Sequence, residues 1–83
     1  MKYTPKPVRM EGIYTIKTSF FENSRVIINS LYEGENVNEE NKIEIGLGMK
    51  MTLDGRILRI MSEQTEKLSK NPELNLITVT TKL

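Results

Sequence analysis

Ile43-Glu44-Ile45-Gly46-Leu47-Gly48-Met49-Lys50-Met51-Thr52-Leu53 is the most regular stretch of this 83-residue sequence. Apolar side chains occupy every second position from 43 to 53, with polar residues or glycines between them. Because successive side chains of a strand point to opposite faces, this period predicts a β-strand with one buried face. Gly46 and Gly48 favour a bulge or sharp bend within that strand, since a phosphate-binding loop needs a wider glycine spacing and a helix directly after it.

The dipeptide Asp54-Gly55 follows this strand. It suits a type I′ hairpin turn, in which both central residues have positive φ. Residues 56–61 would then form the returning strand, with Met51 opposite Leu58 and Met49 opposite Ile60. A second interpretation starts a helix at Asp54, because apolar residues after it approximate one helical face, namely Ile57, Ile60, Met61 and Leu68. The hairpin agrees better with the apolar cross-strand pairs, and we therefore expect the helix to begin only at Ser62, a capping residue, and to end at Asn71-Pro72.

The flanking segments predict more β-structure. Alternation from Gly12 to Phe20, a polar turn at 22–24 and the segment 25–33 predict a first hairpin, with Val26, Ile28 and Tyr32 on one face. Residues 74–82 are rich in Thr, Ile, Val and Leu, which favours a last strand.

The complete pattern predicts a single β-rich domain over 12–83, preceded by an extended N-terminal arm over 1–11 that contains Pro5 and Pro7. We expect an α+β fold that is mostly β. It would contain about five antiparallel strands, arranged as a small barrel or a curved sheet, with one short helix before the last strand.

The residue types that the sequence lacks are the most informative about function. The chain has no His, no Cys and a single Asp, so Ser-His-Asp and Cys-His constellations cannot form, and neither can His- or Cys-based metal sites. The adjacent Glu39 and Glu40 fall in the polar loop 34–41, where nothing would desolvate them and raise their pKa values. We therefore expect a protein that is not an enzyme, with no cofactor and no catalytic or metal-binding residue.

Charge and hydropathy predict where the protein acts. The net charge is +1, which gives no overall field that would attract nucleic acid or a membrane. No stretch reaches the roughly 18 apolar residues that span a bilayer, and the start, Met1 to Pro7, lacks an apolar signal-peptide region. We expect a cytoplasmic protein without membrane contact.

Five residues are candidates for partner binding. In the predicted hairpin Lys50 lies opposite Arg59, and two facing cations repel unless an anion or an acidic partner lies between them; Arg56 adds a third charge nearby. Ile57 shares that polar face. Phe21 directly follows Phe20, so in a strand the two rings point to opposite faces and one leaves the main core. Exposed apolar side chains of this kind often mark interaction sites.

Two classes of function fit these features. The first is a small non-enzymatic protein-binding module, such as an inhibitor, adaptor or assembly factor of the type found in phages and mobile elements. It would contact another protein or self-associate through a sheet edge. The alternative is a small β-barrel that binds single-stranded nucleic acid through Lys50, Arg56, Arg59 and the basic N-terminal arm. No dense row of aromatic residues alternates with Lys or Arg, which favours the first class.

Overall fold

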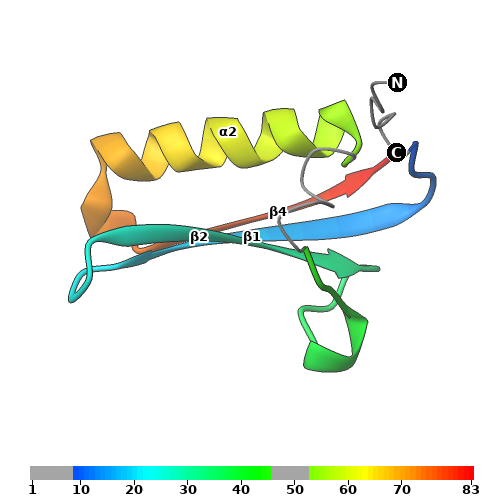
Figure 1. The fold of residues 1–83 in the computed structure, drawn as a ribbon, viewed down its shortest axis with the longest axis horizontal. Coiled ribbons are helices and arrows are strands. Elements are labelled where there is room, and N and C mark those ends of the chain that lie inside the picture. Colours follow the sequence, from blue (N-terminus) through cyan, green and yellow to red (C-terminus); the bar gives the residue numbers. More distant parts are fainter. Residues whose placement is uncertain (1–8, 46–52) are drawn as a thin grey trace, which may run out of the picture.

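A computed structural model of the chain describes residues 9–45 and 53–83 (Figure 1). The strands are β1 (Ile13–Phe21), β2 (Val26–Glu33), β3 (Lys42–Ile43) and β4 (Leu76–Lys82), and the α-helix is α2 (Gly55–Lys70). Short 3-10 turns, η1 (Glu39–Asn41) and η2 (Pro72–Leu74), lie in the connections. The strands form an antiparallel sheet in the order β3-β2-β1-β4, and α2 covers one face of it. The expected α+β class, mostly β with the helix before the last strand, is confirmed.

Strand β1 is the centre of the sheet. It forms the predicted hairpin with β2, in which Phe21 lies opposite Val26 at the turn. On its other side it pairs with β4, so that Ile13 lies opposite Lys82. The first hairpin and the last strand therefore both form as the alternation of their residues predicts.

The hydrophobic core lies between the sheet and the first half of α2. Ile16 of β1 and Leu31 of β2 are paired across the strands, and both are fully buried. Leu53, Ile57 and Met61 pack against them. Each large apolar side chain buried in this way contributes about 1.5–3 kcal/mol to folding.

The segment after Asp54 corrects the hairpin interpretation. Residues 55–70 are helical, and the described part of the sheet has four strands where about five were expected. Asp54 is the N-cap, because its Oδ1 atom accepts the backbone N–H of Arg56 at 2.9 Å. The helix therefore starts seven residues before the predicted Ser62, as in the second interpretation. Of the predicted strand over 43–53, Ile43 belongs to β3, and residues 46–52 lie outside the described residues.

The second half of the helix–sheet interface contains buried polar side chains. Gln64 of α2 donates through Nε2 to the hydroxyl of Thr18 at 2.9 Å and to the carbonyl of Ile77 at 3.2 Å. Thr18 in turn donates to Oδ1 of Asn29 at 2.6 Å, and Asn29 donates to the hydroxyl of Thr65 at 3.2 Å. These bonds fix the position of the second half of the helix over the sheet, where Leu68 is also fully buried.

The start of α2 also holds the end of the N-terminal arm. Oδ2 of Asp54 accepts the backbone N–H of Met10 at 3.0 Å, and the guanidinium of Arg56 donates to the carbonyl of Met10 at 2.7 Å. Residues 1–8 of the predicted arm lie outside the described residues.

Candidate functional site

The candidate residues from the sequence lie in different parts of the fold. Arg56 and Arg59 are exposed on α2, whereas Ile57 on the same helix is fully buried. Phe21 ends β1 at the turn into β2, and its side chain is 48% exposed. Lys50 lies outside the described residues. Phe21 therefore lies on a different element from the two arginines. Ile57 belongs to the core, so its side chain is not available to a partner.

Arg56 is engaged by its neighbours. Its guanidinium forms an ion pair with Asp54 at 2.6 Å. The hydrogen bond from Arg56 and the backbone N–H of Met10 hold the pKa of Asp54 well below its usual value, while Asp54 raises the pKa of Arg56. The pair joins the helix cap to the arm, and its two charges compensate each other.

The sheet face opposite α2, here called the open face, has no α-helix packed on it in the described part of the chain (Figure 1). Thr18 contacts Gln64 and so faces α2, and residues at even spacing from it share that side. The alternate residues of each strand therefore face away from α2. In the long strands these are Ile13, Thr15, Lys17, Ser19, Phe21, Val26, Ile28, Ser30, Tyr32, Leu76, Thr78, Thr80 and Lys82.

One end of the open face is covered. The connection that contains η1 lies on this side of the sheet, opposite α2 (Figure 1). Tyr32 is only 4% exposed, and the hydroxyl of the buried Thr15 donates to the carbonyl of Gly34 at 2.7 Å. The loop after β2 thus lies over the part of this end that contains Thr15 and Tyr32, whereas Ile13 at the end of β1 stays 39% exposed.

The other end of the open face exposes large apolar side chains. Phe21 and Val26 lie opposite each other, and Ser19 lies between its strand partners Ile28 and Leu76. The four apolar residues are between 43% and 50% exposed. We call Phe21, Val26, Ile28 and Leu76 the apolar cluster. It spans three neighbouring strands at the turn end of the sheet.

The charges of the open face have one sign. Lys17 lies opposite Ser30 on β2 and Thr78 on β4, and Lys82 ends β4 on the same face. None of the positions on β1, β2 and β4 that face this side holds a carboxylate. The apolar cluster therefore lies beside a lysine whose charge the strands do not compensate.

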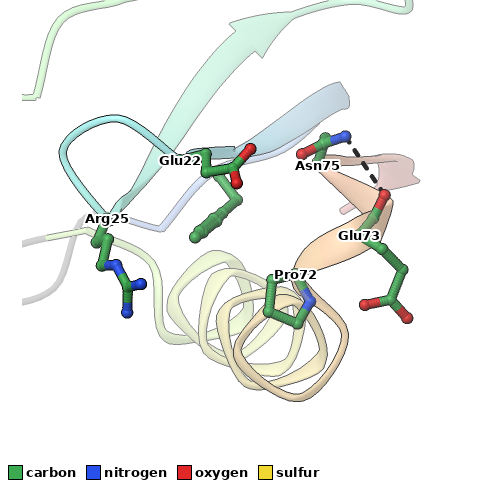
Figure 2. A pocket seen from close by; sticks show the side chains of 6 residues that line it. Glu22, Arg25, Pro72, Glu73 and Asn75 are labelled. Carbon is green, nitrogen blue, oxygen red and sulfur yellow. Dashed lines mark hydrogen bonds between the residues drawn. The ribbon is translucent and has the colours of Figure 1, made fainter.

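A cleft adjoins the cluster at the same end of the molecule. It has a volume of about 520 Å³ and lies between the β1–β2 turn and the connection from α2 to β4. Figure 2 shows Glu22 and Arg25 on the turn side, and Pro72, Glu73 and Asn75 across from them. Phe20 completes the lining. We call this the turn cleft.

Two residues of the turn cleft have unusual backbone conformations. Arg25 has φ of 52° and Asn75 has φ of 63°, and these are the non-glycine residues with positive φ in the described part of the chain. Asn tolerates this left-handed region well, whereas a residue such as Arg loses about 1–2 kcal/mol there. The turn therefore contains an arginine at position 25, where glycine or asparagine would give a more stable fold.

Other kinds of site have no support among residues 9–45 and 53–83. No group of three Asp or Glu side chains in these ranges could hold a metal ion. The helices described in the structure also include none that is long and apolar enough to cross a membrane.

The surface features described above are thus an apolar cluster, a neighbouring lysine and a cleft. No protein-family model, curated protein or solved structure matches this chain.

Proposed function

We propose that this protein is a small non-enzymatic protein-binding module, an inhibitor, adaptor or assembly factor, that binds its partner with the apolar cluster. The exposure of Phe21, Val26, Ile28 and Leu76 at 43–50% on adjacent strands is the observation that carries the proposal. Contiguous apolar surface on a small protein commonly marks an interface, and aromatic and aliphatic side chains form the core of interfaces.

The proposed partner presents apolar side chains next to a carboxylate. An apolar group would pack on Phe21 and Ile28, and an acidic group would lie near Lys17, which has Ser30 and Thr78 as its strand partners. Desolvated apolar anchors supply most of the affinity of such contacts, and charge pairs at the rim add specificity.

The backbone of this surface is held before binding. Phe21 and Val26 are paired across β1 and β2, and Leu76 belongs to β4, which pairs with β1 along its length. A surface on paired strands loses less conformational entropy on binding than a loop does. This supports a role in recognition for the sheet face.

The alternative to a protein partner is single-stranded nucleic acid. Single-stranded nucleic acid binds to exposed rings that alternate with cations. On the open face Tyr32 is buried, so Phe21 is the exposed ring among the described residues. The charge of Arg56 is compensated by Asp54. These features support the protein-binding proposal.

The test compares substitutions inside and outside the cluster. Tagged wild-type protein, Phe21→Ala, Ile28→Ser and Val37→Ser are used to capture proteins from an extract of the native cell, followed by quantitative mass spectrometry. Val37 is the matched control, because it is 46% exposed but lies in the loop after β2. A protein captured by wild type is then produced in pure form, and its Kd for each variant is measured by calorimetry.

We expect Phe21→Ala and Ile28→Ser each to weaken binding by about tenfold or more, as anchor residues do. Val37→Ser should leave Kd unchanged. If all three variants bind the purified partner like wild type, the proposal is wrong. It is also overturned if wild type binds a generic single-stranded oligonucleotide at submicromolar Kd with a salt dependence of about 0.7 log unit per phosphate contacted.

A further inference from the structure

The outer edge of β4 has a defined set of backbone groups that point away from the sheet. Gly12 and Leu83 exchange two backbone hydrogen bonds, at 3.2 and 2.8 Å, and Phe20 donates to the carbonyl of Asn75 at 2.7 Å. In an antiparallel ladder, hydrogen-bonded pairs alternate with pairs that are not hydrogen-bonded. The N–H and C=O groups of Ile77, Val79 and Thr81 therefore point to β1. Those of the alternate residues point outward, namely Leu76, Thr78, Thr80 and Lys82.

This edge lacks the features that normally prevent strand addition. No described residue forms a hydrogen bond with the outward backbone groups of β4. The strand contains no proline, its register with β1 runs without a bulge, and its one charged residue, Lys82, lies at its end. Natural sheets usually protect such edges with prolines, bulges or central charges. The opposite edge of the sheet differs, because β3 is only two residues long.

We propose that two copies of this chain pair through β4, antiparallel, about a two-fold axis at Val79. The two sheets then form one continuous sheet with both α2 helices on the same face. This inference does not rest on the proposed partner-binding function, because it is argued from the backbone groups at the edge of the sheet; Leu76 is the one residue that the edge shares with the apolar cluster.

The register follows from complete overlap of the two strands. When Val79 of one copy lies opposite Val79 of the other, Leu76 faces Lys82 and Thr78 faces Thr80 of the second copy. All of these facing residues carry outward backbone groups, so every outward N–H and C=O of both strands finds a partner. A shift in either direction leaves some of these groups unpaired.

The side chains of β4 also favour a second copy of this chain as the partner that pairs with the edge. Thr facing Thr and Val facing Val are favourable cross-strand pairs. The aliphatic part of Lys82 would cover the exposed Leu76 of the second copy, and the two Lys82 charges would lie at opposite ends of the paired strands. A two-fold contact uses the same edge of both copies, so the assembly closes at two.

The first experiment removes an outward N–H. Thr78→Pro deletes a donor that β1 does not use, and the oligomeric state of the full chain is measured by sedimentation equilibrium over a concentration series. Thr78→Val is the matched control, because it changes the side chain and keeps the N–H. We expect wild type and Thr78→Val to be dimers and Thr78→Pro to be a folded monomer. A wild type that stays monomeric up to millimolar concentration, or a Thr78→Pro variant that stays dimeric, overturns the proposal.

The second experiment tests the register and does not depend on how Thr78→Pro folds. Since the chain has no Cys, Val79→Cys introduces a single thiol. At the two-fold axis the two thiols would lie in a pair that is not hydrogen-bonded, with Cα atoms about 4.5 Å apart, which is within disulfide reach. Oxidation should cross-link Val79→Cys much faster than Ile77→Cys, which would lie opposite Thr81. Equal cross-linking at both positions, or none at 79, contradicts the proposed axis.

Discussion

Asp54 accepts the backbone N–H of Met10 at 3.0 Å through the carboxylate atom that also forms its ion pair with Arg56. Met10 and Asp54 are 44 positions apart in the sequence. One side chain therefore caps α2 and fixes the chain that leads into β1.

This contact predicts a pH dependence of stability. Hydrogen bonds from Arg56 and Met10 lower the pKa of Asp54 below its ordinary 3.8, so the folded state favours the charged carboxylate more than the unfolded state does. The stabilisation is present above the ordinary pKa and is lost as the pH falls through and below it. Asp54→Asn keeps a capping side chain but removes the charge. We expect its free energy of unfolding, measured with urea, to lie below that of wild type at about pH 6, with a difference that begins to shrink only below the ordinary pKa of 3.8 and is smaller at about pH 2.

Glu63→Gln is the control for this comparison. Glu63 is exposed on α2 and forms no ion pair with any described residue. Its substitution should leave the pH profile of wild type unchanged. A constant difference between wild type and Asp54→Asn from about pH 6 to about pH 2 would show that the charge of Asp54 does not stabilise the fold.

We expect that replacement of Gly55 by alanine will stabilise the protein. It is the first residue of α2, and a Cβ added there meets no atom within 4 Å. Gly55→Ala should stabilise the protein by about 0.5–1 kcal/mol, because alanine has fewer conformations to lose on folding. Gly34→Ala is the control: it also has free space, but its φ is 85°. That variant should lose about 1 kcal/mol, and thermal melts that show the same sign for both would contradict the helical start at Gly55.

Substitutions of Gln64 test how the polar part of the helix–sheet interface contributes to stability. It is 5% exposed, and its Oε1 atom is buried without a hydrogen bond among the described residues. Gln64→Met should change the free energy of unfolding by less than about 1 kcal/mol, because the lost hydrogen bonds are offset by removal of the buried, unpaired oxygen. Gln64→Glu should be destabilised by more than about 2 kcal/mol at neutral pH.

The loss in Gln64→Glu should decrease at acid pH. Burial disfavours the charged carboxylate and raises its pKa in the folded state, so the penalty exists above the unfolded pKa and fades below it. The carbonyls of Ile16 and Ile77, which accept from Gln64 in the native protein, would further disfavour the anion. Urea titrations at neutral and acid pH measure both effects. A pH-independent loss would show that the side chain leaves the interface.

The positive φ of Arg25 costs conformational free energy, and a substitution by glycine should remove this cost. Because its φ is 52°, Arg25→Gly should raise the free energy of unfolding by about 0.5–1 kcal/mol. Ser24→Gly is the neighbouring control, since Ser24 does not have positive φ, and it should give no gain. If the two variants have equal denaturation midpoints, the turn is not strained at Arg25. A stabilised Arg25→Gly that binds the partner less well would assign the turn cleft to the interface.

The sequence predicts the strands better than it predicts the helix start. The β1–β2 hairpin and β4 follow from period-2 alternation and β-forming residues. The start of α2 does not, because Asp54-Gly55 suits both a hairpin turn and a helix cap. The buried face of the helix also includes Gln64, a residue that a hydropathy pattern counts as exposed. Gln64 fills the position between Met61 and Leu68 on this face, so the apolar pattern alone leaves a gap there.

The apolar cluster could be predicted only in part. Phe21 is expected outside the main core because it follows Phe20 directly. Val26 and Ile28 alternate with Ile27 and Asn29, so the sequence places Val26 and Ile28 on one face. The face that α2 covers contains Thr18 and Asn29, which meet Gln64 in a polar network across the interface, beside the buried apolar Ile16 and Leu31. Hydrophobicity alone therefore does not identify the exposed face.

The pairing of β1 with β4 determines the order in which this protein can fold. The β1–β2 hairpin joins neighbouring segments and can form within microseconds, whereas Ile13 must find Lys82 across most of the chain. Loop-closure entropy makes such distant pairing the slow step. Until it occurs, β1 has an unpaired edge at the centre of the future sheet. The folding rate and the tendency to aggregate during refolding should therefore both depend on how fast residues 76–82 reach β1.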